Sequence, residues 1–269
     1  MNIAILGTGN MGRALIAGLL RKYGGGVRIV AWDKNDGALK GIDPAVNISD
    51  ARAWFAAHEP PDAVVLAVKP FDIESSLATI VTGGDPARLT QALWISIAAG
   101  RSIASLQKLL PANCRVCRVM PNTPALIDEA MSVYTLGENA SQNDAKLVET
   151  IFQACGKTIQ VPEKFMNAVT GLSGSGPAYV FFFLESLIEA GVIAGLPQRI
   201  ARECALQTLI GAARMAEASP DSLSDLKMKV MTPAGTTASA FAVLEQNGFK
   251  HTLIKAVIAA ARRSEQLEN

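Results

Sequence analysis

The chain has 269 residues, of which 49% are apolar and 18% charged. A chain this long and apolar buries a large core, which excludes a disordered protein and a small scaffold held by disulfides or a metal. Its 25 basic and 24 acidic residues leave a net charge of +1, so we expect neither nucleic acid nor a membrane as a partner. Four cysteines and the absence of a signal-peptide pattern predict reduced thiols and a cytoplasmic location.

Up to about residue 160, short apolar runs typical of strands alternate with patterns typical of helices. This alternation predicts βαβ units and an open parallel sheet with helices on both faces, and each connection is long enough for a parallel strand. The expected strands are residues 3–6, 27–32, 63–68, 93–98, 115–120, 131–136 and 157–161, and the expected helices are residues 10–22, 50–57, 71–81, 102–110 and 142–154.

After Pro162 the strand signals stop, and we place a domain boundary there. Residues 1–161 are expected to form an α/β domain and residues 162–269 an all-helical domain. The expected helices of the second domain are residues 163–170, 177–194, 198–216, 221–229, 236–247 and 249–267.

The helix expected at residues 178–194 is apolar nearly all the way round, interrupted by Glu185, Ser186 and Glu189. A helix of this kind has to be buried on every side. Either a second subunit covers it or it is the central helix of a single chain, and the period of the pattern does not separate these alternatives.

A glycine-rich turn, Gly7-Thr8-Gly9-Asn10-Met11-Gly12, joins the first strand to the first helix. In this context the Gly-x-Gly-x-x-Gly spacing predicts a dinucleotide site. Gly7 permits the tight turn, Gly9 lets a pyrophosphate approach the backbone, and Gly12 lets helix and strand pack closely. The N-terminus of the helix then offers free N–H groups to the phosphates.

The second strand ends at Trp32-Asp33-Lys34, where two charges point to different cofactors. An acidic residue here bonds the adenosine ribose and favours NAD, whereas Lys34 would meet a 2′-phosphate and favour NADP. The two signals conflict, and a solvated surface turn is the alternative to both.

Further segments follow strand ends, where ligands of open α/β sheets bind. Lys69-Pro70 follows the third long apolar strand, and the rigid segment Met120-Pro121-Asn122-Thr123-Pro124 follows another. In the helical half, the segment Thr232–Thr237 begins a helix and offers N–H groups to an anion, or is a simple N-cap.

Two other motifs predict no chemistry. Residues 171–177, GLSGSGP, do not fit the Gly-x-Ser-x-Gly pattern of a nucleophilic serine. Cys114 and Cys117 have no second cysteine pair or nearby histidine to complete a zinc site, and on a strand they would point to opposite faces. We expect no metal.

The chain resembles the pyrroline-5-carboxylate reductase family over essentially its whole length. The resemblance rests on GTGNMG at 7–12, AVKP at 67–70, AAG at 98–100, MPNTPA at 120–125, AVTGLSGSGPAYVF at 168–181 and TPAGTT at 232–237. It implies an N-terminal Rossmann-type domain joined to a C-terminal all-α dimerisation domain that interlocks with a second copy. Rings of dimers also occur in the family.

The resemblance implies that NADPH, or NADH, reduces the cyclic imine 1-pyrroline-5-carboxylate to L-proline. The hydroxyl of Thr237 would bond the ring nitrogen, the backbone N–H groups of Gly235, Thr236 and Thr237 would hold the carboxylate, and Glu163 would lie near the substrate. The implied cofactor contacts are Leu6, Gly7, Thr8, Gly9, Asn10, Met11, Lys34, Asn47, Ala67, Val68, Lys69, Pro70, Ala98 and Ala99. Gly12 is counted with them on the spacing of the glycine-rich turn.

The chain departs from the family pattern at several positions. Ala234 replaces a usual glycine, and Asn167 stands where aspartate is common, so Asn167 receives no catalytic role. Two other classes share the plan. A β-hydroxyacid dehydrogenase would have a catalytic lysine after Gly176, where this chain has Pro, Ala, Tyr, Val and Phe. A non-catalytic NADP-binding sensor would keep the glycine-rich turn but would not reduce a substrate.

Overall fold

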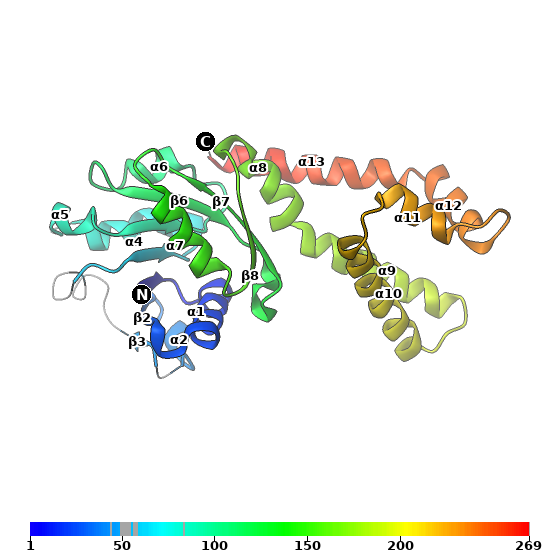
Figure 1. The fold of residues 1–269 in the computed structure, drawn as a ribbon, viewed down its shortest axis with the longest axis horizontal. Helices are drawn as coiled ribbons and strands as arrows, with labels where there is room; N and C mark the ends of the chain where they lie inside the picture. Colours follow the sequence, from blue (N-terminus) through cyan, green and yellow to red (C-terminus); the bar gives the residue numbers. More distant parts are fainter. Residues whose placement is uncertain (44, 49–54, 56–58, 83, 269) are drawn as a thin grey trace. The chain divides into compact units, whose positions relative to one another are not determined.

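The computed structural model describes residues 1–43, 45–48, 55, 59–82 and 84–268. Its chain divides into two compact units (Figure 1). The first unit comprises Met1–Ser175 together with Ala259–Asn269, and the second unit comprises Gly176–Ile258. The boundary expected at residue 161 follows the last strand, whereas the first unit continues through the helical segments up to Ser175.

The first unit is built on one sheet, whose described strands run in the order β3-β2-β1-β4-β5-β6-β7-β8. Every strand expected from the sequence is present, and the short β3 is an addition. The strands are β1 Asn2–Leu6, β2 Arg28–Trp32, β3 Asn47–Ile48, β4 Ala63–Leu66, β5 Leu93–Ser96, β6 Arg115–Met120, β7 Ala130–Leu136 and β8 Gly156–Gln160.

Helices cover both faces of this sheet, as expected of strands that are apolar on both sides. Ile3 and Ile5 of β1 pack with α1 and α7 on one face, while Ala4 and Leu6 pack with α4 and α6 on the other. The helical elements are α1 Asn10–Tyr23, η1 Gly24–Gly26, α2 Asp36–Leu39, η2 Pro70–Asp72, α4 Ile73–Val81, α5 Pro86–Leu89, α6 Ile103–Gln107, η3 Thr123–Ile127 and α7 Gln142–Phe152. The helix expected at 50–57 lies outside the described residues except for Phe55.

The expectation of an all-parallel sheet is wrong at one strand. β7 runs antiparallel to β6, with Met120 opposite Val133. Residues 121–129 form the connection and contain only η3, which is shorter than the crossover that a parallel strand needs. β8 then returns parallel to β7 after α7.

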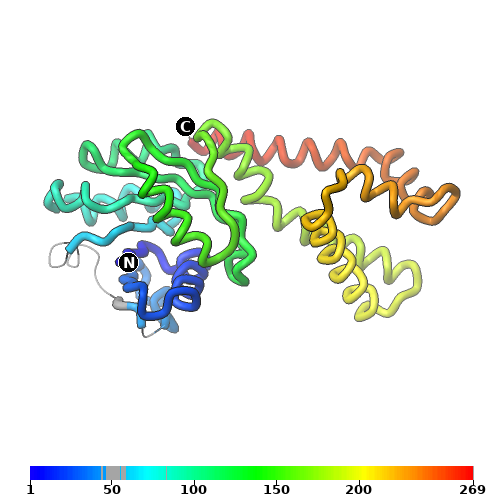
Figure 2. The backbone as a smooth tube through the Cα atoms, in the orientation of Figure 1, coloured from blue at the N-terminus to red at the C-terminus, as the bar shows by residue number. Residues whose placement is uncertain are grey.

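The first unit ends in a chain of short helical turns, η4 Glu163–Phe165, α8 Met166–Val169 and the π-helical turn η5 Thr170–Gly174. The glycine-rich segment after residue 170 is therefore helical rather than an open loop. In Figure 2 the red C-terminal end of the chain lies beside α8, and a hydrogen bond between Glu268 and Asn167 joins the two.

The second unit contains helices only among its described residues. They are α9 Gly176–Ile193, α10 Gln198–Ala218, α11 Leu223–Val230, α12 Thr236–Gln246 and the beginning of α13 Phe249–Glu268. α9 and α10 pack closely at Gly191, where an added Cβ would lie 3.0 Å from Cβ of Ala201. Lys227 of α11 lies over the ring of Phe241 of α12.

Within the second unit, the apolar helix α9 is not a buried central helix, so that alternative is wrong for this unit. Within α9, all of which the structure describes, Leu184 is the one buried side chain. Phe181 and Phe182 are 64% and 71% exposed. The helical stretch 163–193 is long and apolar enough to cross a membrane by length and composition alone, a test that core helices of soluble proteins also pass. We expect a second copy of the chain to cover α9.

We therefore predict that the chain is an obligate dimer or a multiple of a dimer, with Phe181, Phe182 and Leu187 in the interface. Leaving such large apolar side chains in water would cost about 1.5–3 kcal/mol each relative to full burial. Static light scattering at micromolar concentration measures the particle mass. A stable particle of 28.3 kDa would contradict the prediction.

Candidate active site

The turn between β1 and α1 is built on two glycines that allow a very close backbone approach. Gly7 has φ +101°, and an added Cβ would lie 2.6 Å from the carbonyl carbon of Ala67. A Cβ on Gly12 would lie 2.1 Å from the carbonyl oxygen of Gly7. These contacts confirm the structural roles expected of Gly7 and Gly12.

Gly9 has a different environment. A Cβ added there would meet no atom within 4 Å, so packing does not require a glycine at this position. Gly9 is also the N-cap of α1, and no side chain caps that helix. The open space at Gly9 and the N–H groups at the start of α1 fit the pyrophosphate of a dinucleotide.

The carboxylate of Asp33 holds the glycine-rich turn from the end of β2. The backbone N–H of Thr8 donates to Asp33 Oδ2 at 2.7 Å, and the Thr8 hydroxyl lies 3.2 Å from the same oxygen. The N–H of Asn35 donates to Oδ1 at 2.9 Å. Both carboxylate oxygens are thus engaged within the protein, although the sequence offered Asp33 as a ribose acceptor.

Lys34 forms an ion pair with Asp72, which follows β4 in η2. Its Nζ lies 6.0 Å from the ring centre of Phe71, and its side chain is 58% exposed. The ion pair links the loops that follow β2 and β4.

The segments expected to contact the cofactor lie at one edge of the sheet. β2, β1, β4 and β5 are neighbouring parallel strands, so their carboxyl ends face the same way. The N–H of Ala67 donates to the carbonyl of Leu6 at 2.7 Å, which joins the ends of β4 and β1. The strand order reverses between β1 and β4, which is where open α/β sheets bind dinucleotides.

The other expected cofactor residues lie after β4, after β5 or in β3. Lys69 is exposed before η2, Ala98 is buried after β5, and Asn47 pairs with Val30 in β3. The carboxyl edge and the segments that follow it carry Leu6, Gly7, Thr8, Gly9, Asn10, Met11, Gly12, Lys34, Ala67, Val68, Lys69, Pro70, Ala98 and Ala99. Asn47 instead lies level with Val30, before the end of β2.

The Met120–Pro124 segment lies against the glycine-rich segment after α8. Asn122 Nδ2 lies 3.3 Å from both the carbonyl oxygen and the hydroxyl of Ser173, and its Oδ1 accepts from the N–H of Met131 at 3.0 Å. Asn122 has φ −129°, so its backbone is extended, and Asp128 at the end of η3 takes the left-handed conformation.

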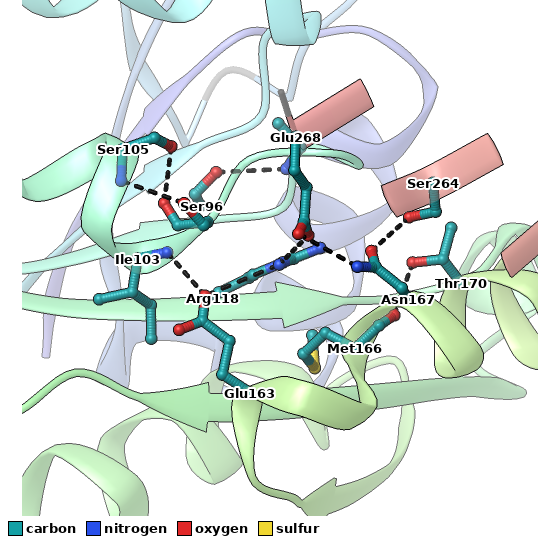
Figure 3. A network of polar contacts seen from close by, with 12 residues as sticks. Ser96, Ile103, Ser105, Arg118, Glu163, Met166, Asn167, Thr170, Ser264 and Glu268 are labelled. Carbon is teal, nitrogen blue, oxygen red and sulfur yellow. Dashed lines mark hydrogen bonds and ion pairs between the residues drawn. The ribbon is translucent and has the colours of Figure 1, made fainter. Parts of the chain in front are cut away.

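Glu163, expected near the substrate, lies in a cluster of polar side chains (Figure 3). Its Oε1 accepts from the N–H of Ile103 at 2.8 Å and lies 3.7 Å from the guanidinium of Arg118. Sequence reasoning missed Arg118, although a charge between apolar residues of a buried strand is a signal of a buried ion pair.

The candidate substrate residues lie at the start of α12 in the second unit. Gly235 is the N-cap, and no side chain caps the helix, so Thr237 is not the N-cap that the sequence left open. The Gly235 N–H donates to the Thr232 carbonyl at 3.0 Å, which removes it from the groups expected to hold a carboxylate. Ala234 has φ +57°, a conformation that a glycine adopts at lower cost.

Cys114 and Cys117 lie on opposite faces of the sheet, in the two separate cores. Burial raises the pKa of Cys114 to about 11 and raises the pKa of Cys117 further. Neither thiol is suited to ligate a metal or to act as a nucleophile.

The two environments of Gly9 and Gly12 predict opposite phenotypes for the same substitution. Gly9 has φ −68°, and an added Cβ would have open space around it. We therefore expect Gly9→Ala to leave the melting temperature unchanged and to raise the Kd for NADP⁺. Gly12→Ala is expected to destabilise the fold by about 1–3 kcal/mol through overpacking. Thermal unfolding and cofactor titration of both variants measure this. A cofactor Kd unchanged by Gly9→Ala would remove Gly9 from the site.

Comparison with known proteins identifies the family. Residues 163–267 match the family model for pyrroline-5-carboxylate reductase dimerisation, and residues 2–100 match the model for NADP oxidoreductase, coenzyme F420-dependent. The pyrroline-5-carboxylate reductase of Synechocystis is 35% identical over 99% of this chain and 98% of its own length.

Two solved structures are similar over the full chain. The pyrroline carboxylate reductase of Plasmodium falciparum with NADP bound has a TM-score of 0.87 and 32% identity, covering 100% of this chain and 98% of its own. The pyrroline-5-carboxylate reductase of Coxiella burnetii has a TM-score of 0.89 and 33% identity with the same coverage. The chain therefore belongs to the pyrroline-5-carboxylate reductase family of NAD(P)H-dependent oxidoreductases.

Proposed function

We propose that this chain reduces the C=N bond of 1-pyrroline-5-carboxylate to give L-proline, with Thr237 at the reacting nitrogen. The observation that carries the proposal is the start of α12, where two threonines follow an uncapped helix N-terminus, in a chain that also has a dinucleotide turn. The reaction consumes the imine, one NAD(P)H and one proton, and it yields L-proline and NAD(P)⁺.

The N-terminus of α12 supports binding of the substrate carboxylate. The first N–H groups of a helix have no acceptor within the helix, and the helix dipole favours an anion there. The first bond within α12 is donated by Ser239 to the carbonyl of Gly235. The N–H groups of Thr236 and Thr237 therefore hold the carboxylate. Gly235 instead closes the turn, since an added Cβ would lie 2.3 Å from the Thr232 hydroxyl oxygen.

The hydroxyl of Thr237 bonds the ring nitrogen. A protonated imine has a more electrophilic carbon, so a hydrogen bond at nitrogen assists the addition of hydride. A hydroxyl both donates and accepts, so Thr237 can follow the nitrogen from imine to amine without an ionised side chain. Glu163 is retained as a residue near the substrate on the resemblance alone.

The cofactor residues are those at the carboxyl edge of the sheet. When bound, NAD(P)H supplies the hydride that adds to the imine carbon. We propose NADPH as the preferred donor, because both oxygens of Asp33 are engaged by Thr8 and Asn35 and a ribose diol would have to displace those bonds. Lys34 is 58% exposed beside them, and it exchanges its surface ion pair with Asp72 for the 2′-phosphate.

The assembly completes the proposal. Residues 1–161 bind the cofactor, and residues 162–269 bind the substrate and form the homodimer, in which α9 lies against the second copy rather than in a membrane. Association of dimers into a ring is proposed on the resemblance, and a cytoplasmic location is proposed on the four cysteines, which form no disulfide framework. No nucleic acid takes part.

One measurement separates the enzyme from a non-catalytic NADP-binding sensor. Addition of 1-pyrroline-5-carboxylate to the protein and NADPH should lower the absorbance of NADPH with formation of L-proline. A sensor would bind NADPH without oxidising it. The family assignment already disfavours a β-hydroxyacid dehydrogenase, which would oxidise hydroxyacids instead.

Thr237→Ala should lower kcat/KM roughly 10- to 150-fold, because a hydrogen bond to a charged group contributes about 1.5–3 kcal/mol. Thr237→Ser keeps the hydroxyl and should lose much less. Cofactor Kd should change little in either variant. Steady-state kinetics and thermal unfolding on the same preparations measure these effects. Full specific activity of folded Thr237→Ala would remove Thr237 from the mechanism.

Lys34→Ala should raise the KM for NADPH at least about fivefold. A charge-assisted hydrogen bond contributes about 1.5 kcal/mol or more, and solvent screening at this exposed side chain reduces that contribution. The KM for NADH should change little, because NADH has no 2′-phosphate. Arg202→Ala, an exposed change on α10, is a control for loss of one positive charge. Equal changes in the KM for NADPH and the KM for NADH would show that Lys34 does not bind the 2′-phosphate.

A further inference from the structure

Arg118 is a charged side chain inside the first unit, with only 2% of its surface exposed. It lies on β6, where it is paired in register with Ser96 of β5. Its Nη1 donates to Glu268 Oε1 at 2.6 Å, whereas Glu163 is more distant, at 3.7 Å. A buried guanidinium needs a close counter-charge, and Glu268, in the last turn of α13, supplies it.

The second oxygen of Glu268 is also engaged. Asn167 of α8 donates from Nδ2 to Glu268 Oε2 at 3.1 Å. The Oδ1 of Asn167 accepts from the hydroxyl of Ser264 at 2.7 Å, and Ser264 is buried one turn earlier in α13. Figure 3 shows Glu268 between Arg118 and Asn167, with Ser264 on the far side of Asn167. The end of α13 is therefore held at two points.

The same turn packs against the loop that follows β5. Gly100 in this loop has φ +68°, and an added Cβ would lie 2.6 Å from Cβ of Leu267. At the other end of the loop, the N–H of Ile103 donates to Glu163, which faces the same guanidinium. The loop at residues 97–102 therefore lies between two contacts, one with Leu267 next to Glu268 and one with Glu163. Both glutamates face Arg118.

We propose that the last turn of α13 positions the β5–α6 loop for the cofactor, and that Glu268 is the positioning residue. The proposal rests on the proposed function in one respect, the assignment of Ala98 and Ala99 in this loop as cofactor contacts. Glu268 is assigned no contact with cofactor or substrate. It acts by holding Leu267 against Gly100 through its bonds to Arg118 and Asn167.

The test uses the full-length enzyme and NADP⁺ as the probe. Glu268→Ala removes both bonds, and Gln266→Ala trims an exposed side chain of the same turn as the control. Glu268→Ala is expected to raise the Kd for NADP⁺ roughly three- to thirtyfold, within the range found for residues that act through others. Amide hydrogen exchange of residues 97–103 without NADP⁺ should become faster. The Gln266→Ala control should match the wild type in both measurements.

A charge swap separates positioning from general loss of stability. Asn167→Asp alone places two carboxylates about 3 Å apart, as the present bond distance shows, and should raise the Kd for NADP⁺. Adding Glu268→Gln restores one carboxylate and one amide, so that the amide oxygen still accepts from Arg118 and the amide nitrogen donates to the new carboxylate. Because the carboxylate then lies further from Arg118, the double variant is expected to regain only part of the affinity that Asn167→Asp loses.

Each outcome decides the matter. A raised Kd, faster exchange at 97–103 and partial recovery in the double variant support the proposal. An unchanged Kd in a folded, dimeric Glu268→Ala enzyme overturns it, as does a raised Kd without faster exchange in the loop. If the wild-type chain itself does not bind NADP⁺ or oxidise NADPH with 1-pyrroline-5-carboxylate, the proposed function fails instead.

Discussion

The first unit depends on a contact between backbones that no side chain could enter. The turn after β1 passes so close to the end of β4 that a Cβ on Gly7 would overlap the Ala67 carbonyl, and Gly12 closes the turn in the same way. This approach brings the ends of β1 and β4 together where the strand order reverses. The Asp33 carboxylate then holds Thr8 from β2, so three strands determine the shape of one short turn.

The second unit is organised by an opposite requirement. Its helix α9 has little polar surface, and within its own unit only Leu184 of this helix is buried. We expect dimerisation to be part of folding for this unit, because the apolar surface of α9 would become buried in the assembly. The N-terminus of α12, with Thr237 in its first turn, belongs to the part of the chain that the dimer stabilises.

Local sequence patterns were sufficient to predict much of the fold and part of the candidate site. The expected strands, the turn of Gly7 and Gly12, and the apolar character of α9 follow from period and spacing, which report on neighbours near in sequence. The antiparallel β7 was missed because its direction depends on a short connection rather than on its residues. The engagement of Asp33 by Thr8 and the bond between Glu268 and Arg118 join residues far apart in sequence, and a single sequence does not reveal such pairs.

The buried cysteines have a consequence for the behaviour of the protein towards oxidants. Burial raises the pKa of Cys114 and of Cys155 to about 11, and Cys117 is shielded still more strongly. At neutral pH only about one thiol in ten thousand at such a site is a thiolate, the form that reacts with peroxides and disulfides. Oxidants in solution are therefore expected to react slowly with these three buried thiols.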